Sequence, residues 1–196
     1  MALLAELIVE EWLNRQGYFT LRGVKTGVDE IDLLAVRPED GKLECRHLEV
    51  QASMRPVSYI SKVPKGVQKR EGRAANSAKR SADELELGVR EWVSNKFEKA
   101  KKRVLIAGLA PGPWSKELVI HRVKSVEEVN LIAGHGIVIH HLSAIVRELR
   151  SDTFRIESAG GADFMDLLLM GDHAASTTTV DDALAAAVYD PRRDKP

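Results

Sequence analysis

The sequence predicts an α/β fold built on a mixed sheet, and three observations support this class. Hydrophobic residues make up 44% and charged residues 30% of the 196 residues, as in globular proteins with a packed core. Short β-type runs alternate with stretches whose apolar residues recur at helical spacing. Strands that follow such helical stretches need crossover connections, which are typical of sheets that contain parallel pairs.

The N-terminal part of the chain is predicted to form one helix followed by three strands. Large apolar residues recur at helical spacing from Leu3 to Leu13, and Gly17 is suited to end this helix. The strands are expected over residues 18–21, 31–36 and 45–51. The stretch between the second and third strands contains Pro, Asp and Gly, which predicts a hairpin loop.

The remainder begins with a long basic loop and then alternates between helices and strands. Residues 52–81 carry few large apolar side chains and are interrupted by Pro and Gly, which predicts the loop. The expected elements after it are a helix over 84–102, strands over 103–109 and 117–121, a helix that begins at Ser125, a strand over 137–140 and helices over 142–149 and 162–170. We expect a single domain over residues 1–171 and a loosely packed tail over 172–196.

Composition excludes several classes of protein. The chain has one cysteine, Cys45, so a disulfide framework and a cysteine-cluster zinc site are excluded. The longest nearly apolar run, residues 104–110, is far shorter than the roughly 20 residues that span a bilayer. The N-terminus has an early glutamate and no basic region of the kind that opens a signal peptide. We therefore expect a cytoplasmic protein with no membrane association.

Charge is balanced overall but unevenly distributed. The chain has 29 basic and 29 acidic residues, yet residues 51–103 hold 14 basic and 6 acidic ones between acidic flanks. A basic middle segment favours a polyanionic partner such as DNA. A solvated loop and helix rich in lysine is the other interpretation.

Two carboxylates occupy unusual positions in the predicted sheet. Asp32 interrupts an apolar strand, and Glu49 shares one face of the next strand with Gln51. A hairpin that joins these strands would hold both carboxylates close together, where they repel unless a cation neutralises them. A hard divalent cation with oxygen ligands is the usual solution, and it can activate water for attack on a phosphoryl group. Glu6, beside the apolar stripe of the first helix, completes the set.

Each of these residues also has an ordinary structural explanation. Asp32 could lie at an exposed strand end, and Gln51 could be a surface residue. Glu49 could pair with Arg46 or His47. The combination, in this order and spacing, nevertheless favours a functional site over three unrelated residues.

The combination resembles the PD-(D/E)xK nuclease superfamily, and more narrowly the branch that holds archaeal Holliday-junction resolvases, Mrr-like restriction nucleases and small YraN-like proteins. The matching parts are the helix with Glu6, the run Gly27-Val28-Asp29-Glu30-Ile31-Asp32-Leu33-Leu34-Ala35 and the run Leu48-Glu49-Val50-Gln51. Motif support thus covers roughly residues 3–51. The resemblance implies a restriction-endonuclease-like mixed sheet of about four to six strands flanked by helices.

By position, the resemblance implies a site for Mg²⁺ (or Mn²⁺) with Asp32, Glu49 and Glu6 as ligands, and with Glu10 as a fallback for Glu6. One departure matters, because the lysine of the family motif is Gln51 here. A glutamine can hold a water molecule but carries no positive charge.

Some members of the superfamily replace this lysine, and others recruit one from a neighbouring element. Lys25, Lys62 and Lys65 are the candidates for such a replacement.

The basic loop then has a plausible role beside the site. Its cations could follow a phosphate backbone, and Tyr59 could stack on a base or sugar. The residues expected to bind nucleic acid are Lys62, Lys65, Lys69, Arg70 and Arg73.

The sequence therefore predicts a Mg²⁺-dependent deoxyribonuclease with Asp32, Glu49, Gln51 and Glu6 in its catalytic site. Two alternatives share the fold. One is a catalytically degenerate module that binds DNA or a protein, and the other is a toxin or defence component whose activity needs a homodimer or a partner chain.

Overall fold

A five-stranded mixed sheet forms the centre of the fold, and its strands lie side by side in chain order. The first three strands, β1 (Phe19–Thr26), β2 (Asp29–Glu39) and β3 (Lys42–Val57), pair antiparallel. The last two, β4 (Trp114–Val123) and β5 (Ile137–His141), are parallel to β3. The predicted α/β class, with a mixed sheet flanked by helices, is confirmed.

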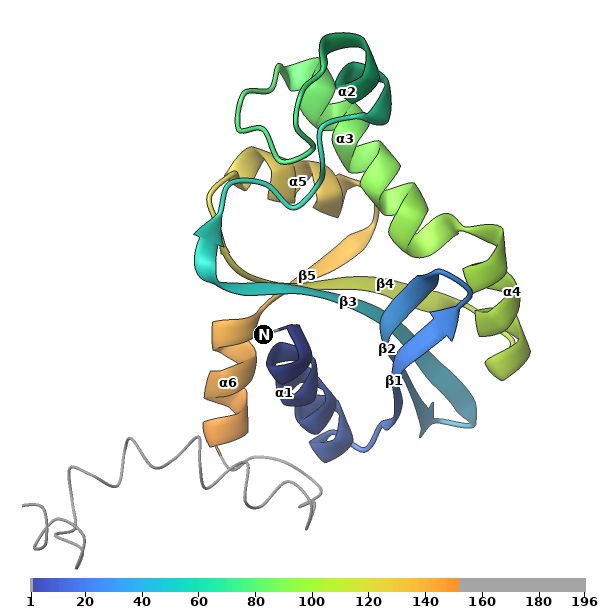
Figure 1. Ribbon diagram of the computed structural model, residues 1–196. Coiled ribbons are helices and arrows are strands. Elements are labelled where there is room, and N and C mark those ends of the chain that lie inside the picture. Colours follow the sequence, from blue (N-terminus) through green and yellow to red (C-terminus); the bar gives the residue numbers. More distant parts are fainter. Residues whose placement is uncertain (1, 152–196) are drawn as a thin grey trace, which may run out of the picture. The chain divides into compact units, whose positions relative to one another are not determined.

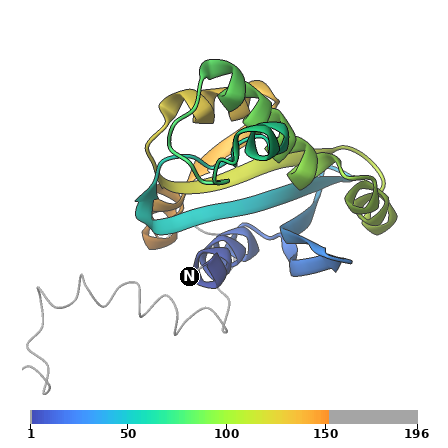
Figure 2. The same ribbon diagram turned by 45° about the horizontal axis from the view of Figure 1, so that its top comes forward.

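Helices cover both faces of this sheet (Figures 1 and 2). One face carries α1 (Ala2–Arg15) and α6 (Leu142–Arg150). The other carries α3 (Ala82–Val93) and α5 (Val126–Gly134), with the short α2 (Lys65–Glu71) beyond α3. After α3 the chain passes through a π-helical turn, η1 (Ser94–Glu98), into α4 (Ala100–Leu109). These helices supply the crossovers that the parallel pairs require.

The structure is a computed structural model, and it describes residues 2–151 apart from the side chains of Ala2 and Met54. The described residues all belong to one compact unit. The predicted helix over 162–170 and the predicted boundary at residue 172 lie outside the described residues. Within the described range, no helix is long and apolar enough to cross a bilayer.

The apolar core between the sheet and α3 places the strands that carry the candidate site. Its buried members, from α3 to β5, are Val89, Trp92, Val93, Phe97, Leu118, Ile120, Ile132 and Ile137. A smaller cluster joins Ile31 and Leu34 of β2 to Ile106 of α4. The helices that follow β3 are therefore fixed against the strands of the N-terminal hairpin.

A buried ion pair lies on the opposite face. Arg46 of β3 donates to both carboxylate oxygens of Glu117 on β4, at 2.8 and 2.6 Å, and stacks over the ring of Trp12. His140 lies 2.7 Å from the same carboxylate. Burial alone would raise the pKa of Glu117, but the hydrogen bonds from Arg46 and His140 lower this pKa to about 2. The pair therefore joins neighbouring strands and shows that Arg46 is not a partner of Glu49.

The sequence-based assignment is wrong at three places. Residues 103–109 form part of α4, not a strand, because a short apolar run is compatible with either element. Within it Val104 is 75% exposed and Ile106 only 8%, as on the two sides of a helix. The expected helix over 84–102 is instead divided at η1, and β3 continues to Val57 into the predicted loop.

Candidate active site at the divergence of two strands

Asp32 and Glu49 lie on the adjacent antiparallel strands β2 and β3. Pairing between these strands extends as far as Leu33 and Leu48, and β2 then continues with β1 as partner. Where the ladder stops, Asp32 Oδ2 accepts a hydrogen bond of 2.7 Å from the backbone N–H of Val50. The carboxylate thus satisfies a backbone donor that has lost its strand partner, and this contact fixes Asp32 beside Glu49.

The two carboxyl groups are close enough to influence each other's ionisation. Burial, the negative charge of Glu49 and a side-chain hydrogen bond with Glu49 raise the pKa of Asp32 to about 7, against the lowering effect of Lys96 and the Val50 N–H. Two carboxyl groups this close cannot both be ionised without a neutralising cation. Asp32 is consequently the member of the pair that lacks a cation of its own.

Glu49 is fully buried, and three side chains surround it. His47 Nε2 lies 3.3 Å and Lys102 Nζ 3.0 Å from Oε1, while Lys96 Nζ donates to Oε2. Burial alone would raise the pKa of Glu49, but the hydrogen bond with His47 and the charges of Lys96 and Lys102 lower it to about 2. The structural explanation in which Glu49 pairs with His47 is therefore correct for that contact, and it coexists with the carboxylate pair.

Sequence reasoning missed both lysines of the site. Lys96 belongs to η1 and Lys102 to α4, about fifty residues after Glu49 along the chain. Lys102 is only 1% exposed, and its ammonium also donates to the backbone oxygen of Lys96 at 3.0 Å. A nearly buried lysine in the middle of a basic, helix-like stretch gives no sequence signal that separates it from its solvated neighbours.

A cleft of about 690 Å³ opens at Asp32, whereas the fully buried Glu49 is not among the residues that line it. Its floor includes Asp32 and Gln51, and its walls come from the β1–β2 turn, the loop before α2, the end of α3, and η1 with α4. The lysines that line it are Lys62, Lys65, Lys96, Lys99 and Lys102. Acidic residues line the cleft as well, namely Asp29, Glu30, Asp32 and Glu91. The cleft therefore combines carboxylates, which a metal ion needs, with ammonium groups, which a phosphodiester needs.

The predicted replacements for the family lysine separate into two groups. Lys62 and Lys65 line the cleft, as does Gln51. Lys25 is an exposed residue of β1 and does not line it. The ammonium in contact with the carboxylate pair is that of Lys96, which the sequence prediction did not include.

Glu6 lies at the periphery of the site. It is half-buried on α1, and burial raises its pKa, with Arg22 and Glu30 as the strongest charged influences. The fallback residue Glu10 is engaged elsewhere, because its carboxylate pairs with Arg22 at 2.9 Å. The structure therefore brings Asp32, Glu49 and Gln51 together and leaves Glu6 outside this group.

The loop that carries Lys62 and leads to Lys65 at the start of α2 is held firmly. Fully buried Glu128 of α5 accepts hydrogen bonds from the N–H of Ile60 at 2.6 Å, and from the N–H and Oγ of Ser61 at 2.8 and 2.5 Å. On the other side, a Cβ atom at Gly88 of α3 would lie 2.7 Å from the backbone oxygen of Lys62. Lys62 and Lys65 are thus presented by a fixed wall of the cleft.

Other members of the basic segment are engaged within the protein. Arg80 donates to the backbone oxygen of Ser61 at 2.8 Å and stacks over the ring of Tyr59, so Tyr59 is partly covered by an arginine. Arg73 pairs with Glu84 at 2.6 Å. Arg70 pairs with Glu71, while Lys69 is exposed on α2. Of the five predicted nucleic-acid ligands, Lys62 and Lys65 are those at the cleft.

The residues present fit a hard divalent cation. Among the residues from 2 to 151, no three His, Cys, Asp or Glu side chains gather as a complete ligand set. Mg²⁺, however, is commonly held by one or two carboxylates and retains several waters. The Asp32–Glu49 pair and the amide of Gln51 are oxygen donors of this kind, and Asp32 has the raised pKa of a carboxyl without a cation.

Comparisons with known proteins add little to this geometry. No family model matches the chain, and no curated protein matches it. Among solved structures, the chain is similar to one titled "Crystal Structure of Protein of Unknown Function AF1548", with a TM-score of 0.42 and 12% identity, over 96% of this chain and 89% of that one. A likeness at that TM-score carries no argument about function.

Proposed function

We propose that the cleft hydrolyses phosphodiester bonds of DNA with the help of Mg²⁺ or Mn²⁺ bound at Asp32 and Glu49. The observation that supports this most is that Asp32, which lines a cleft together with five lysines, interacts with the neighbouring buried carboxyl group of Glu49. It agrees with what the PD-(D/E)xK resemblance implies for the same two residues. When bound, the cation would supply Lewis-acid stabilisation of the phosphoryl group and lower the pKa of an attacking water.

In each carboxylate of the pair, one oxygen would be held by protein groups and the other would bind the cation. The Val50 N–H holds Asp32 Oδ2, and His47 with Lys102 holds Glu49 Oε1. The remaining oxygens are Asp32 Oδ1 and Glu49 Oε2, and Glu49 Oε2 would be available for ligation once Lys96 releases it. Carboxylates fixed in this way need little rearrangement, which is how preorganised sites gain their effect.

Lys96 would take the part of the lysine that the family motif has at position 51. Its side chain is 24% exposed, lines the cleft and pairs with Glu49 Oε2, so it can move from the carboxylate to a phosphate oxygen. Gln51 would then hold a water through its amide, and Lys96 would supply the positive charge.

A second candidate is a module that binds DNA without cutting it. The observation that favours it is that both oxygens of Glu49 are already paired with lysine ammonium groups. Such a network could replace the cation permanently and leave only the basic walls functional.

Metal binding and cleavage distinguish the two candidates. We expect Mn²⁺ binding by calorimetry to be lost in Asp32→Asn and Glu49→Gln, and slow Mg²⁺- or Mn²⁺-dependent cleavage to be lost with it. Lys96→Met should retain Mn²⁺ and lower cleavage roughly 10²–10³-fold, as for loss of one charged donor. Lys124→Met, which removes an exposed lysine outside the cleft, is the matched control.

Gln51→Lys should keep or raise the rate. If the wild-type protein and Gln51→Lys bind no Mn²⁺ and cut neither duplex, single-stranded nor branched DNA, the enzyme proposal is wrong and the binding module takes its place.

A further inference from the structure

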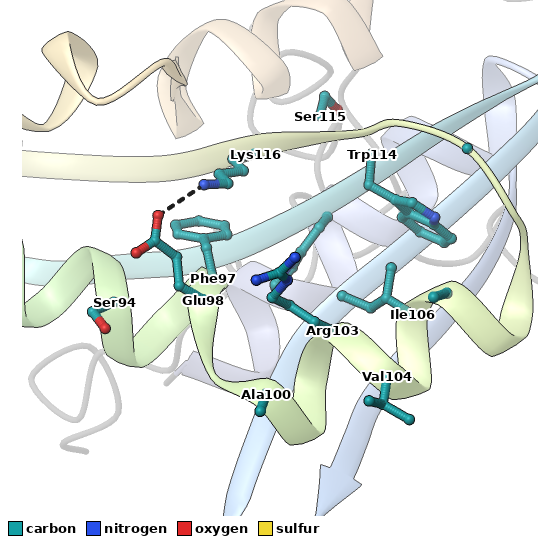
Figure 3. Close-up of a pocket in the computed structure, with 13 residues that line it drawn as sticks. Ser94, Phe97, Glu98, Ala100, Arg103, Val104, Ile106, Trp114, Ser115 and Lys116 are labelled. Carbon is teal, nitrogen blue, oxygen red and sulfur yellow. Dashed lines mark hydrogen bonds and ion pairs between the residues drawn. The ribbon is translucent and has the colours of Figure 1, made fainter.

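A second hollow, of about 1050 Å³, lies between α4 and the beginning of β4 (Figure 3). Phe97 and Glu98 of η1 stand on one side of it, and Trp114 and Lys116 of β4 on the other. Arg103 projects from α4 between these groups. The site residues described above, apart from His47, do not line this hollow.

The hollow carries an uncompensated positive charge. Glu98 is its one acidic lining residue, and Lys116 neutralises it at 3.1 Å. Arg103 is exposed, and no hydrogen bond or ion pair to it is found among the described residues. The half-buried Trp114 adds an aromatic ring, whose Nε1 donates to the backbone oxygen of Ala110. A free guanidinium beside an indole is suited to a phosphate with an adjoining base or sugar.

A third depression relates the hollow to the cleft through shared lining residues. A shallow depression of about 330 Å³ over the end of α3 is lined by Lys65, Arg90, Glu91, Ser94 and Asn95. It shares Lys65, Glu91 and Asn95 with the cleft and Ser94 with the second hollow. The three concave regions therefore follow one another across η1, from the carboxylate pair to Arg103.

We infer that a single DNA strand that leaves the cleft crosses η1 at Asn95 and Ser94 and enters the second hollow, where Arg103 contacts a phosphate and Trp114 a base or sugar. This inference rests on the proposed function, because it extends the path of the same substrate. A single strand fits better than a duplex, since the hollow mixes a cation with aromatic and apolar side chains that paired bases could not reach.

Oligothymidylates of two lengths test the path. In EDTA, where no cleavage occurs, fluorescence anisotropy would compare the parent, Arg103→Ala and Arg147→Ala, the last an exposed arginine on α6 of the opposite face. For an oligomer of about 12 nucleotides we expect Arg103→Ala to weaken binding about threefold or more and to reduce the salt slope by about 0.7, the share of one phosphate. An oligomer of about 4 nucleotides, which the cleft alone would hold, should bind all three proteins alike.

Each other outcome overturns a specific claim. If Arg103→Ala binds the longer oligomer as Arg147→Ala does while the parent binds it well, the second hollow is not on the path and the proposed function stands. If Arg103→Ala weakens the binding of a duplex of equal length as much as that of the single strand, the partner at Arg103 is a duplex. If the parent binds neither, the proposed action on DNA fails together with the inference.

Discussion

Replacing Gly88 by alanine should destabilise the protein, although alanine is the better helix former. Gly88 lies inside α3, where alanine would gain about 1 kcal/mol in helix propensity. The new Cβ would, however, stand 2.7 Å from the backbone oxygen of Lys62, whereas ordinary contacts begin near 3.4 Å. The helix or the loop would therefore have to move by several tenths of an ångström.

The loop cannot move without loss. Its neighbours Ile60 and Ser61 are bonded to buried Glu128, and Val63 N–H donates to the backbone oxygen of Ala75 at 2.8 Å. Overpacking against a fixed backbone costs about 1–3 kcal/mol. The packing cost exceeds the propensity gain, and we expect a net loss of about 1 kcal/mol.

Gly108→Ala in α4 is the matched control, because no atom lies within 4 Å of its would-be Cβ. It should stabilise by about 0.5 kcal/mol. Urea unfolding measures both, and with a slope of about 2 kcal/mol per molar the two midpoints should move in opposite directions by a few tenths of a molar. A midpoint for Gly88→Ala that rises as much as that for Gly108→Ala would refute the close packing of α3 on the Lys62 loop.

Two further predictions concern carboxylates. Glu117 has a pKa of about 2 in the folded protein, against 4.5 for an unperturbed glutamate, so its ionised form contributes roughly 3 kcal/mol to the free energy of unfolding. This contribution is complete above a pH of about 5 and is lost as the pH falls towards 2. The stability gap between wild type and Glu117→Gln in urea should narrow over that range, and a constant gap would contradict the assignment. Asp32→Asn should raise the free energy of unfolding of the metal-free protein by about 2 kcal/mol at neutral pH or above, because the amide keeps the acceptor for Val50 and removes a buried charge beside Glu49. A lower urea midpoint for Asp32→Asn would show that Asp32 has a stabilising cationic partner.

The sequence was most informative where the pattern is local. The helix cap at Ser125, whose side chain accepts from the Glu128 N–H, and the positive φ of Gly17 lie where the motifs predict them. The placement of Asp32 and Glu49 on neighbouring strands also follows from a short hairpin and the two-residue period of a strand. These features depend only on residues close in the chain.

The parts of the site that could not be predicted from the sequence depend on contacts between residues far apart in the chain. Lys96 and Lys102 are six residues apart, a spacing that would not bring both to one carboxylate on a regular α-helix. The break at Lys99, where the backbone is extended between η1 and α4, makes their convergence possible. Likewise, Arg73 and Arg80 look like free cations in the sequence, and only the fold reveals Glu84 and Glu128 as their partners.

The π-helical turn η1 also bears on which insertions and deletions the site tolerates. A π-helical turn holds one residue more than the α-helical turn it replaces, so it is what a single inserted residue leaves in a helix. Deleting Ser94 or Asn95 would restore an α-helical turn at the end of α3 and rotate Lys96 by about 100° about the helix axis. Lys96 would then point away from Glu49 Oε2. Chain length at this turn, more than residue identity, is what a descendant of this protein must conserve to keep the site.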